Sequence, residues 1–345
     1  MSRFRALAAL AVGSALVLTG CAGTSAAPGG SDASSSSAEG SFPVTIDHAF
    51  GETTIPAEPK RVVTVSWGNQ EAALALGVVP VAMPKVTWGD EDGDGLLPWV
   101  KDKLDELGAE TPTLMDETNG FDYEAIADAR PDVILGAYSG MTQEQYDTLS
   151  KIAPVVSFPE IAWGTSWQEM TLTDAKALGR EAEAEKLVSD LEAHVTEETA
   201  KYPALNGKKT LFTYLDPTDI STVGYYSLKD PRALYLSELG MAPSSAVETS
   251  STDSETFWFT QSTENIETFS DVDTIVGYGT SELLTQLQAD PLWSRIPAIA
   301  SGSVAMLTDD TTMAAAANPS PLSIGTSYGD DYIAVVGEAA AKAGS

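Results

Sequence analysis

The chain has 345 residues, and its 50 acidic against 19 basic side chains give a net charge of −31 at neutral pH. A charge this negative argues against nucleic-acid binding, because phosphate binding needs lysine and arginine. The protein's surface is also repelled by anionic lipid headgroups. One cysteine and two histidines exclude a disulfide framework, a structural zinc site with four Cys/His ligands and a three-histidine metal centre, so no metal ligands are expected.

The first 20 residues have the pattern of an export signal, here of the lipoprotein type. Arg3 and Arg5 form a basic start, and the apolar run 6–17 is too short to span a bilayer as a helix. Cys21 follows Leu-Thr-Gly, as in a bacterial lipobox, where the thiol is lipidated and the chain is cut just before it. We expect residues 1–20 to be removed and Cys21 to anchor the protein on the outer face of the cytoplasmic membrane. The alternative is an ordinary secretory signal.

Residues 21–41 are predicted to be the lipidated cysteine and a flexible tether, because they are rich in Ala, Gly, Ser and Thr and carry almost no apolar bulk. The folded body is predicted to begin near Phe42. The length of the remaining chain suggests about two domains.

The first lobe is predicted over 42–165, where short apolar strands alternate with helices. Strands are expected at 44–46, 61–65, 78–83, 132–135 and 155–158, and helices at 69–76, 96–107, 123–129 and 143–152. Segment 51–59 is predicted to be a turn. The alternation is typical of βα units around a parallel sheet.

The segment 166–202 is predicted to link two lobes. Its apolar residues recur at helical spacing with Glu and Lys between them, and Gly179 is expected to divide it. The second part would be a helix of about 33 Å. The βα pattern then resumes over 203–345. The predicted fold class is therefore α/β, with two Rossmann-like lobes joined by a single long helix.

Several short motifs in this order resemble a known family. They are Pro-Lys-Arg-Val-Val (59–63), Ala-Leu-Gly-Val-Val-Pro-Val (75–81), Tyr-Glu-Ala-Ile (123–126), Arg-Pro-Asp-Val-Ile-Leu (130–135), Ile-Ala-Pro-Val-Val (152–156), Ala-Asp-Pro-Leu-Trp (289–293), Ile-Pro-Ala (296–298) and Gly-Ser-Val (302–304). The ordered set behind a lipobox resembles the iron-siderophore binding proteins of ABC importers, the group related to the ferric-citrate, ferrichrome and vitamin B12 binding proteins.

The resemblance implies the class III periplasmic-binding-protein fold, with a rigid connecting helix and the ligand between the lobes. It implies capture of a ferric siderophore and delivery to an ABC permease, with no catalytic activity and no resident cofactor. The protein is expected to be a monomer that touches the membrane only through its anchor. A corrinoid or haem on the same scaffold, an exported hydrolase and a structural lipoprotein or adhesin remain as alternatives.

The resemblance also assigns permease docking to one glutamate on each lobe, and the matching positions are Glu124 and Glu264. Exposed carboxylates on both lobes would give the permease two contact points that fix how the protein docks, since charges at the rim of an interface set orientation and association rate. The alternative is that each is a first-turn acid interacting with the helix dipole.

A ferric chelate needs an aromatic bowl with a few polar groups, and α/β proteins bind ligands beyond the carboxyl ends of strands. The aromatic residues expected there are Trp67, Trp88, Tyr138, Trp163, Tyr225, Tyr226, Trp258 and Tyr278. Any one of them could instead be a core residue. Trp99, Trp167 and Trp293 lie in helical or apolar patterns and are predicted to be core.

Basic residues are scarce near these loops, which offer only Lys85, Lys229 and Arg232. A triply anionic catecholate complex needs several arginines, so the scarcity favours a neutral or cationic ferric hydroxamate. Arg232 is the expected polar contact with the ligand. The alternative is that its side chain forms only a surface ion pair with Asp230 or Glu238.

Two further motifs have weaker support. The acidic loop 90–95 starts like a calcium loop, but Lys101 stands where the bidentate Glu belongs, so whether it binds calcium stays open. Gly-Thr-Ser-Tyr-Gly (325–329) matches a nucleophile elbow, yet both histidines precede it, whereas that kind of hydrolase has its histidine after the serine.

Overall fold

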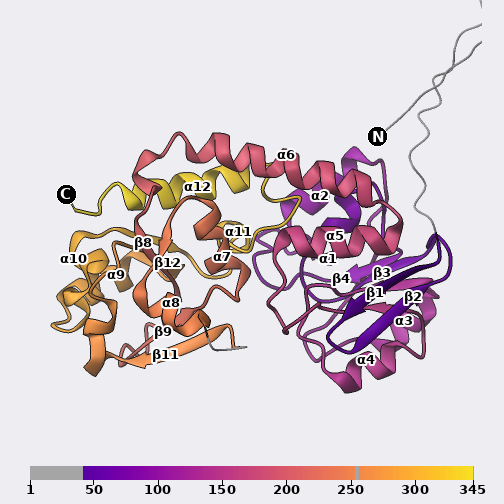
Figure 1. Cartoon of the computed structure of the whole chain (residues 1–345), viewed down its shortest axis with the longest axis horizontal. Coiled ribbons are helices and arrows are strands. Elements are labelled where there is room, and N and C mark those ends of the chain that lie inside the picture. Colours follow the sequence, from indigo (N-terminus) through magenta and orange to yellow (C-terminus); the bar gives the residue numbers. More distant parts are fainter. Residues whose placement is uncertain (1–41, 253–255, 345) are drawn as a thin grey trace, which may run out of the picture. The chain divides into compact units, whose positions relative to one another are not determined.

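The computed structural model describes residues 42–252 and 256–344, which belong to one compact unit (Figure 1). The export signal, Cys21 and the tether predicted before Phe42 lie outside the described residues. Within the described ranges, no helix combines the length and apolarity that a membrane crossing would require.

The N-terminal lobe is built on a five-stranded parallel sheet in the order β5-β4-β3-β6-β7. Its strands and helices are β3 (Val62–Thr64), α1 (Asn69–Ala75), β4 (Ala82–Pro84), α2 (Pro98–Glu106), β5 (Thr113–Met115), α3 (Tyr123–Ala129), β6 (Val133–Leu135), α4 (Gln143–Leu149) and β7 (Val155–Val156). Strands β4, β3, β6 and β7 are buried along their whole length, as expected for a parallel sheet covered on both faces, whereas the edge strand β5 is partly exposed.

An antiparallel hairpin precedes this sheet. It pairs β1 (Val44–His48) with β2 (Gly51–Ile55). The prediction of a turn over 51–59 was therefore wrong for its first half. Thr53 and Ile55 are buried while their neighbours are exposed, a two-residue alternation that the surrounding Gly and Pro had obscured.

The link between the lobes consists of α5 (Trp167–Leu178) and α6 (Glu181–Thr199). Gly179 ends α5 with a φ of 67°, a left-handed conformation that glycine adopts without strain, so the predicted division at this residue is confirmed. In Figure 1, α6 runs from one lobe to the other, alongside α12 (Ser327–Ala340).

The C-terminal lobe has a mixed sheet in the order β11-β9-β8-β12-β13, with β10 beside β8. Its elements before α12 are η1 (Pro203–Leu205), β8 (Lys209–Tyr214), β9 (Thr222–Tyr226), α7 (Pro231–Glu238), β10 (Ala242–Pro243), α8 (Ser245–Thr252), β11 (Trp258–Ser262), η2 (Thr263–Phe269), β12 (Thr274–Tyr278), α9 (Ser281–Ala289), η3 (Trp293–Arg295), α10 (Pro297–Ser301), β13 (Val304–Leu307) and α11 (Thr312–Ala316).

In this second sheet β9 runs antiparallel to β8 and to β11. The expectation of a purely parallel sheet is corrected here. A short connection after β8 leads into β9, and antiparallel neighbours, unlike parallel ones, need no crossover helix between them. The α/β class with two lobes is confirmed.

The core includes the tryptophans predicted to be structural. Trp99, Trp167 and Trp293 expose 2%, 2% and 1% of their surfaces. Trp99 and Trp167 belong to a cluster that continues from the N-terminal lobe into the C-terminal one, where it includes Tyr235 and Tyr332. The lobes therefore share packed apolar surface besides the linking helix.

A second connection between the lobes is polar. Glu71 on α1 is fully buried and accepts hydrogen bonds from Trp99 Nε1, at 2.6 Å, and from the hydroxyl of Ser320 in the segment before α12. Burial raises the pKa of Glu71 to about 7, against the lowering effect of these two donors. The return of the chain to the N-terminal lobe is thus fixed beside α1.

Candidate ligand-binding site

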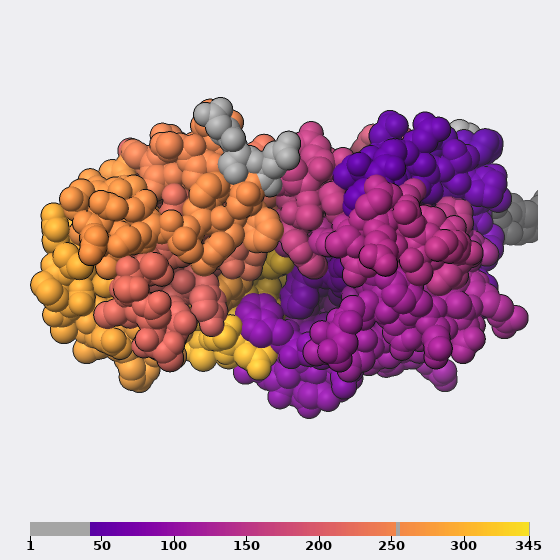
Figure 2. All heavy atoms as spheres, turned by 90° about the horizontal axis from the view of Figure 1, so that it is seen from below, coloured from indigo at the N-terminus to yellow at the C-terminus, as the bar shows by residue number. Residues whose placement is uncertain are grey.

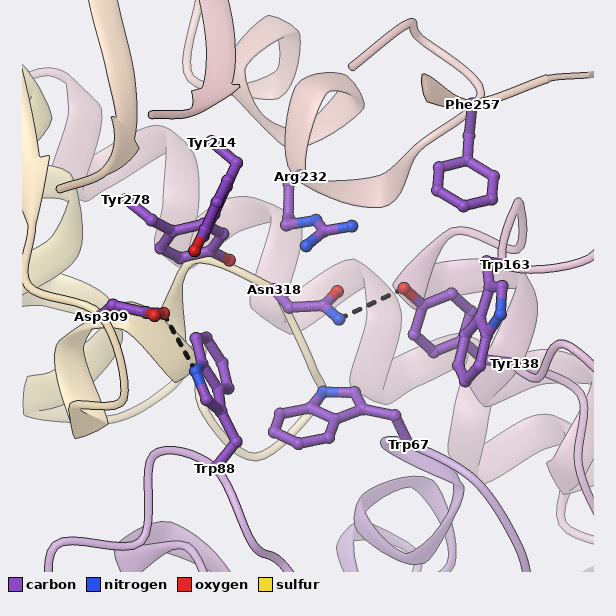
Figure 3. Close-up of a pocket in the computed structure, with 10 residues that line it drawn as sticks. All are labelled: Trp67, Trp88, Tyr138, Trp163, Tyr214, Arg232, Phe257, Tyr278, Asp309 and Asn318. Atoms are coloured by element: carbon purple, nitrogen blue, oxygen red, sulfur yellow. Dashed lines mark hydrogen bonds between the residues drawn. The ribbon is translucent and has the colours of Figure 1, made fainter. Parts of the chain in front are cut away.

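A cavity of about 490 Å³ lies between the two lobes. Figure 2 shows a hollow between the indigo-to-magenta surface of the first lobe and the orange and yellow surface of the second. The side chains that line the cavity are drawn in Figure 3: Trp67, Trp88, Tyr138, Trp163, Tyr214, Arg232, Phe257, Tyr278, Asp309 and Asn318. The lining is mostly aromatic, which suits a bulky ligand with an apolar exterior.

The wall from the N-terminal lobe is held by the side chain of Asn69, the first residue of α1. Its amide nitrogen donates to the carbonyls of Val65, at 2.8 Å, and Tyr138, at 2.9 Å, and its oxygen accepts from the Tyr138 amide at 3.0 Å. This fixes the loops after β3 and β6 against each other. Trp67 and Tyr138 are thereby presented at the carboxyl edge of the sheet, as predicted.

Trp163 packs edge to face against Tyr138, with ring centroids 5.3 Å apart. Its indole lies directly on Gly140, where a Cβ would come within 2.0 Å of Trp163 Nε1. Only glycine at position 140 leaves room for the indole in this place. The loop after β6 and the loop before α5 therefore shape this side of the cavity together.

Trp88 connects the two lobes at the edge of the cavity. Its ring centroid lies 6.0 Å from that of Trp67 and 5.5 Å from that of Tyr278, in edge-to-face arrangements. Its Nε1 donates to Asp309 Oδ1 at 3.1 Å (Figure 3). The backbone amide of the next residue, Gly89, donates to Asp310 Oδ1 at 2.7 Å. The aromatic surface is thus continuous from one lobe to the other.

Arg232 supplies the cavity's guanidinium. It donates to both carboxylate oxygens of Asp230, at 2.8 and 2.6 Å, and its Cζ lies 4.1 Å from the ring centroid of Tyr226. Asp230 has no exposed surface. The two readings of Arg232, ligand contact and ion pair with Asp230, are therefore both compatible with the structure, and the pair carries no net charge.

Six of the nine predicted ligand contacts line the cavity: Trp67, Trp88, Tyr138, Trp163, Arg232 and Tyr278. Tyr226 lies beside them, beneath the guanidinium of Arg232. Tyr225 points to the other face of β9, where it packs on Phe259 and Phe269 in the core.

The placement of Tyr225 is a correction, and its reason is the pleat. Adjacent residues of a strand face opposite sides of a sheet, so two neighbouring tyrosines cannot both face the cavity. Trp258 is corrected too: it packs on Gly224 and against Tyr226, with centroids 4.6 Å apart, and is not part of the lining. Phe257, one residue earlier, lines the cavity instead.

The sequence prediction missed Tyr214, Phe257, Asp309 and Asn318. Tyr214 ends β8, and Asp309 lies two residues beyond β13, so the rule that sites form at the carboxyl ends of strands could have found both. Phe257 and Asn318 carry no such signal, because they precede a strand and a helix. The amide of Asn318 donates to the Tyr138 hydroxyl at 3.2 Å, which closes the floor between the lobes (Figure 3).

The acidic side chains of the loop 90–95 find partners in the loop itself, on α2 and in the C-terminal lobe, where the Thr312 amide donates to Glu91 at 3.0 Å. Asp90 accepts from the amides of Gly93, at 2.8 Å, and Gly95, at 2.6 Å. The ammonium of Lys101 lies 2.5 Å from Asp94 and 3.6 Å from Asp92. Lys101, which stands where a calcium loop has its bidentate glutamate, therefore itself pairs with two of the loop's carboxylates.

Glu124 and Glu264 occupy equivalent places in the two lobes. Glu124 is exposed in the first turn of α3, which leads to β6, and Glu264 is exposed in the first turn of η2, which leads to β12. For neither glutamate does the described part of the chain show an ion pair. Both carboxylates are thus open to a partner.

Ser327 of the elbow-like motif is the first residue of α12 and follows a turn, whereas a nucleophile elbow joins a strand to a helix. Near this helix, His194 and Glu198 of α6 and Asp330 of α12 place one ligand-type atom each within 4.8 Å of the others. Lys201 already pairs with Glu198, at 2.5 Å, so this cluster has its own cation.

Comparison with known proteins places the chain in a family. Residues 62–311 match the model of the family described as "Periplasmic binding protein". The chain belongs to this family. The expected kind of protein, a substrate-binding protein of an ABC transporter of the siderophore type, is thereby confirmed.

Individual relatives agree. This binding protein is 30% identical over 279 residues, 77% of its own length and 80% of the relative's, to a protein of Bacillus subtilis (strain 168) named "Probable siderophore-binding lipoprotein YfiY". It superposes on the crystal structure of Streptococcus pneumoniae TIGR4 PiaA in complex with ferrichrome with a TM-score of 0.83 and 41% identity, covering 87% of this chain and 99% of that one. Staphylococcus aureus SirA complexed with staphyloferrin B, at 23% identity, 86% and 98% coverage and a TM-score of 0.64, supports the fold alone.

Proposed function

We propose that this protein captures a ferric siderophore outside the cytoplasmic membrane and delivers it to an ABC permease. The observation that carries the proposal is the aromatic cavity between the lobes, whose one guanidinium is already neutralised by Asp230. Such a surface binds a bulky chelate through its organic shell and leaves the iron untouched. The similarity to PiaA, crystallised with ferrichrome, supports this ligand class.

Charge favours a ferric hydroxamate over a catecholate. Arg232 and Asp230 cancel each other, and Asp309 adds a carboxylate to the lining. A trianionic chelate would lose its hydration and meet no uncompensated cation in this cavity, which costs free energy. A neutral ferric trihydroxamate meets no such penalty.

The ligand contacts proposed here are Trp67, Trp88, Tyr138, Trp163, Arg232 and Tyr278, with Tyr214, Phe257 and Asn318 added from the structure. Tyr226 would act indirectly, by holding Arg232. Glu124 and Glu264 are proposed as the permease-docking pair, because both are exposed and one stands on each lobe.

The remaining assignments rest on the sequence. We propose lipidation of Cys21, consistent with the relatives named lipoproteins, and action as a monomer. The proposed organisation is a signal over 1–20, a tether over 21–41, lobes over 42–165 and 203–345, and the linking helices over 166–202. The role is binding and delivery, and no catalytic step is proposed.

The test is tryptophan fluorescence of the chain from residue 21 onward, with Cys21→Ser to keep it unlipidated. Ferrichrome, ferric enterobactin, ferric citrate, cobalamin and haem are titrated separately. Saturable quenching by ferrichrome at submicromolar concentration supports the proposal. Quenching by cobalamin or haem alone would move this scaffold to the corrinoid or haem alternative, and no quenching by any of them would favour a structural lipoprotein.

A further inference from the structure

A smaller pocket adjoins the main cavity in the N-terminal lobe. It has a volume of about 290 Å³ and shares Trp67, Trp88 and Trp163 with the main cavity. Glu117 and Gln70 also line it. Glu117 comes two residues after β5, and Gln70 is the second residue of α1, so both stand at the carboxyl edge of the sheet.

Two residues that line this side pocket each have a buried hydrogen-bond acceptor that the described part of the protein leaves unsatisfied. Among the described residues, neither Glu117 Oε1 nor Gln70 Oε1 has a hydrogen-bond partner, although both atoms are buried. The other carboxylate oxygen of Glu117 accepts only from the backbone amide of Ser66, at 2.9 Å. A buried acceptor without a donor costs about 1–3 kcal/mol, so two of them in one pocket point to a donor that comes from outside.

The basic side chain that lines this pocket, Lys85, is not hydrogen-bonded to either oxygen. Its charge acts on Asp116, whose pKa is lowered chiefly by the Thr118 hydroxyl and to a smaller extent by Lys85. The pKa of Glu117, in contrast, is raised to about 7 by burial, opposed only by the amide of Ser66. Within 42–252 and 256–344, no cation compensates this carboxylate.

We propose that the side pocket holds a protonated primary amine at the end of an alkyl arm of the ferric chelate, with Glu117 and Gln70 as its acceptors. The three shared tryptophans would contact the arm, since indole faces attract cations and pack on methylene groups. An ammonium group has three donors, enough for both free oxygens. The iron-bearing part of such a linear trihydroxamate would remain in the main cavity.

This inference rests on the proposed function and narrows it to chelates with a cationic arm. It is tested with two probes that differ only at the arm: ferrioxamine B, which carries a primary ammonium, and its N-acetylated form, which does not. Ferrichrome serves as a third probe without any arm. Dissociation constants are measured by tryptophan quenching.

The wild-type protein is expected to bind ferrioxamine B about tenfold or more tightly than the acetylated form, because a buried charge-assisted hydrogen bond is worth at least that ratio. In Glu117→Gln the ratio should fall to within about twofold. Glu110→Gln is the matched control: it removes one carboxylate from an exposed position outside the pocket and should keep the wild-type ratio.

Equal affinity of the wild-type protein for both ferrioxamines would overturn the inference, and this comparison needs no variant that could misfold. A ratio that persists in Glu117→Gln would overturn it as well. If ferrichrome binds and neither ferrioxamine does, the side-pocket assignment fails while the proposed function stands. If none of the three binds, the proposed ferric hydroxamate ligand itself fails.

Discussion

The guanidinium of Arg232 and the carboxylate of Asp230 form a two-pronged ion pair, with Nε–Oδ1 and Nη2–Oδ2 distances of 2.8 and 2.6 Å. Asp230 also caps α7 by accepting from the Arg232 amide at 2.9 Å. The one guanidinium in the cavity is therefore fixed in direction and cancelled in charge. A ligand can accept hydrogen bonds from it without having to be an anion.

Replacing Asp230 with Asn should change the ligand charge that the cavity accepts. The substitution keeps a capping oxygen for α7 but leaves Arg232 with an uncompensated charge. We expect affinity for anionic ferric enterobactin to rise relative to ferrichrome, by about tenfold. Competitive titration measures the ratio, and Asp128→Asn, an exposed position on α3, is the charge-matched control. An unchanged ratio would contradict the charge argument.

The aromatic wall should carry much of the binding free energy. Trp67→Ala removes a large ring from this wall, and we expect ferrichrome affinity to fall about tenfold or more, as for other central aromatic anchors. Quenching of the remaining tryptophans measures it. Trp293→Phe, in the core of the C-terminal lobe, should lower the thermal stability but leave the affinity within about twofold. If ferrichrome affinity fell equally in both variants, the loss would reflect lower stability and not the removal of a ligand contact.

Docking to the permease should require both exposed glutamates. Glu124→Ala with Glu264→Ala is expected to abolish uptake of radioactive ferric siderophore by whole cells and to leave the dissociation constant unchanged. Glu144→Ala with Glu282→Ala is the matched control, because these are also exposed acids in the first turn of a helix, one on each lobe. If both double variants reduce uptake alike, Glu124 and Glu264 act as first-turn acids that stabilise their helices, and the docking assignment is wrong.

The buried carboxyl of Glu71 should make stability depend on pH. Its pKa is raised to about 7 in the folded chain, so between pH 4.5 and 7 the folded state binds more protons than the unfolded state. The free energy of unfolding should therefore fall as pH rises through this range, by about 3 kcal/mol in all. Above pH 7 the loss is complete.

Glu71→Gln should remove this component, because its amide oxygen can accept from Trp99 and Ser320 without ionising. Urea denaturation at pH 5 and pH 8 compares the variant with the wild type, and Glu110→Gln is the exposed control. Relative to the wild type, the free energy of unfolding of the variant is expected to be higher at pH 8 than at pH 5. Parallel curves at the two pH values would show that Glu71 does not titrate in this range.

The sequence by itself determined the alternating α/β pattern, the helical link divided at Gly179, the core tryptophans and the family. These follow from local signals: hydrophobic periodicity, a glycine at a left-handed cap, and ordered motifs. It also found six cavity residues. Trp67 and Tyr138 closely follow strands and Tyr278 ends one, and the carboxyl ends of parallel strands share one edge of a sheet.

Only the tertiary structure decided which side chains of the antiparallel edge face the cavity. Tyr225 and Tyr226 are neighbours in sequence but face opposite sides of β9, and the choice between them depends on the register with β8 and β11. The same holds for Trp258 and Phe257. Gln70 and Glu117 line one pocket although they stand 47 positions apart in the chain, and no local pattern records that proximity, because long-range packing alone creates it.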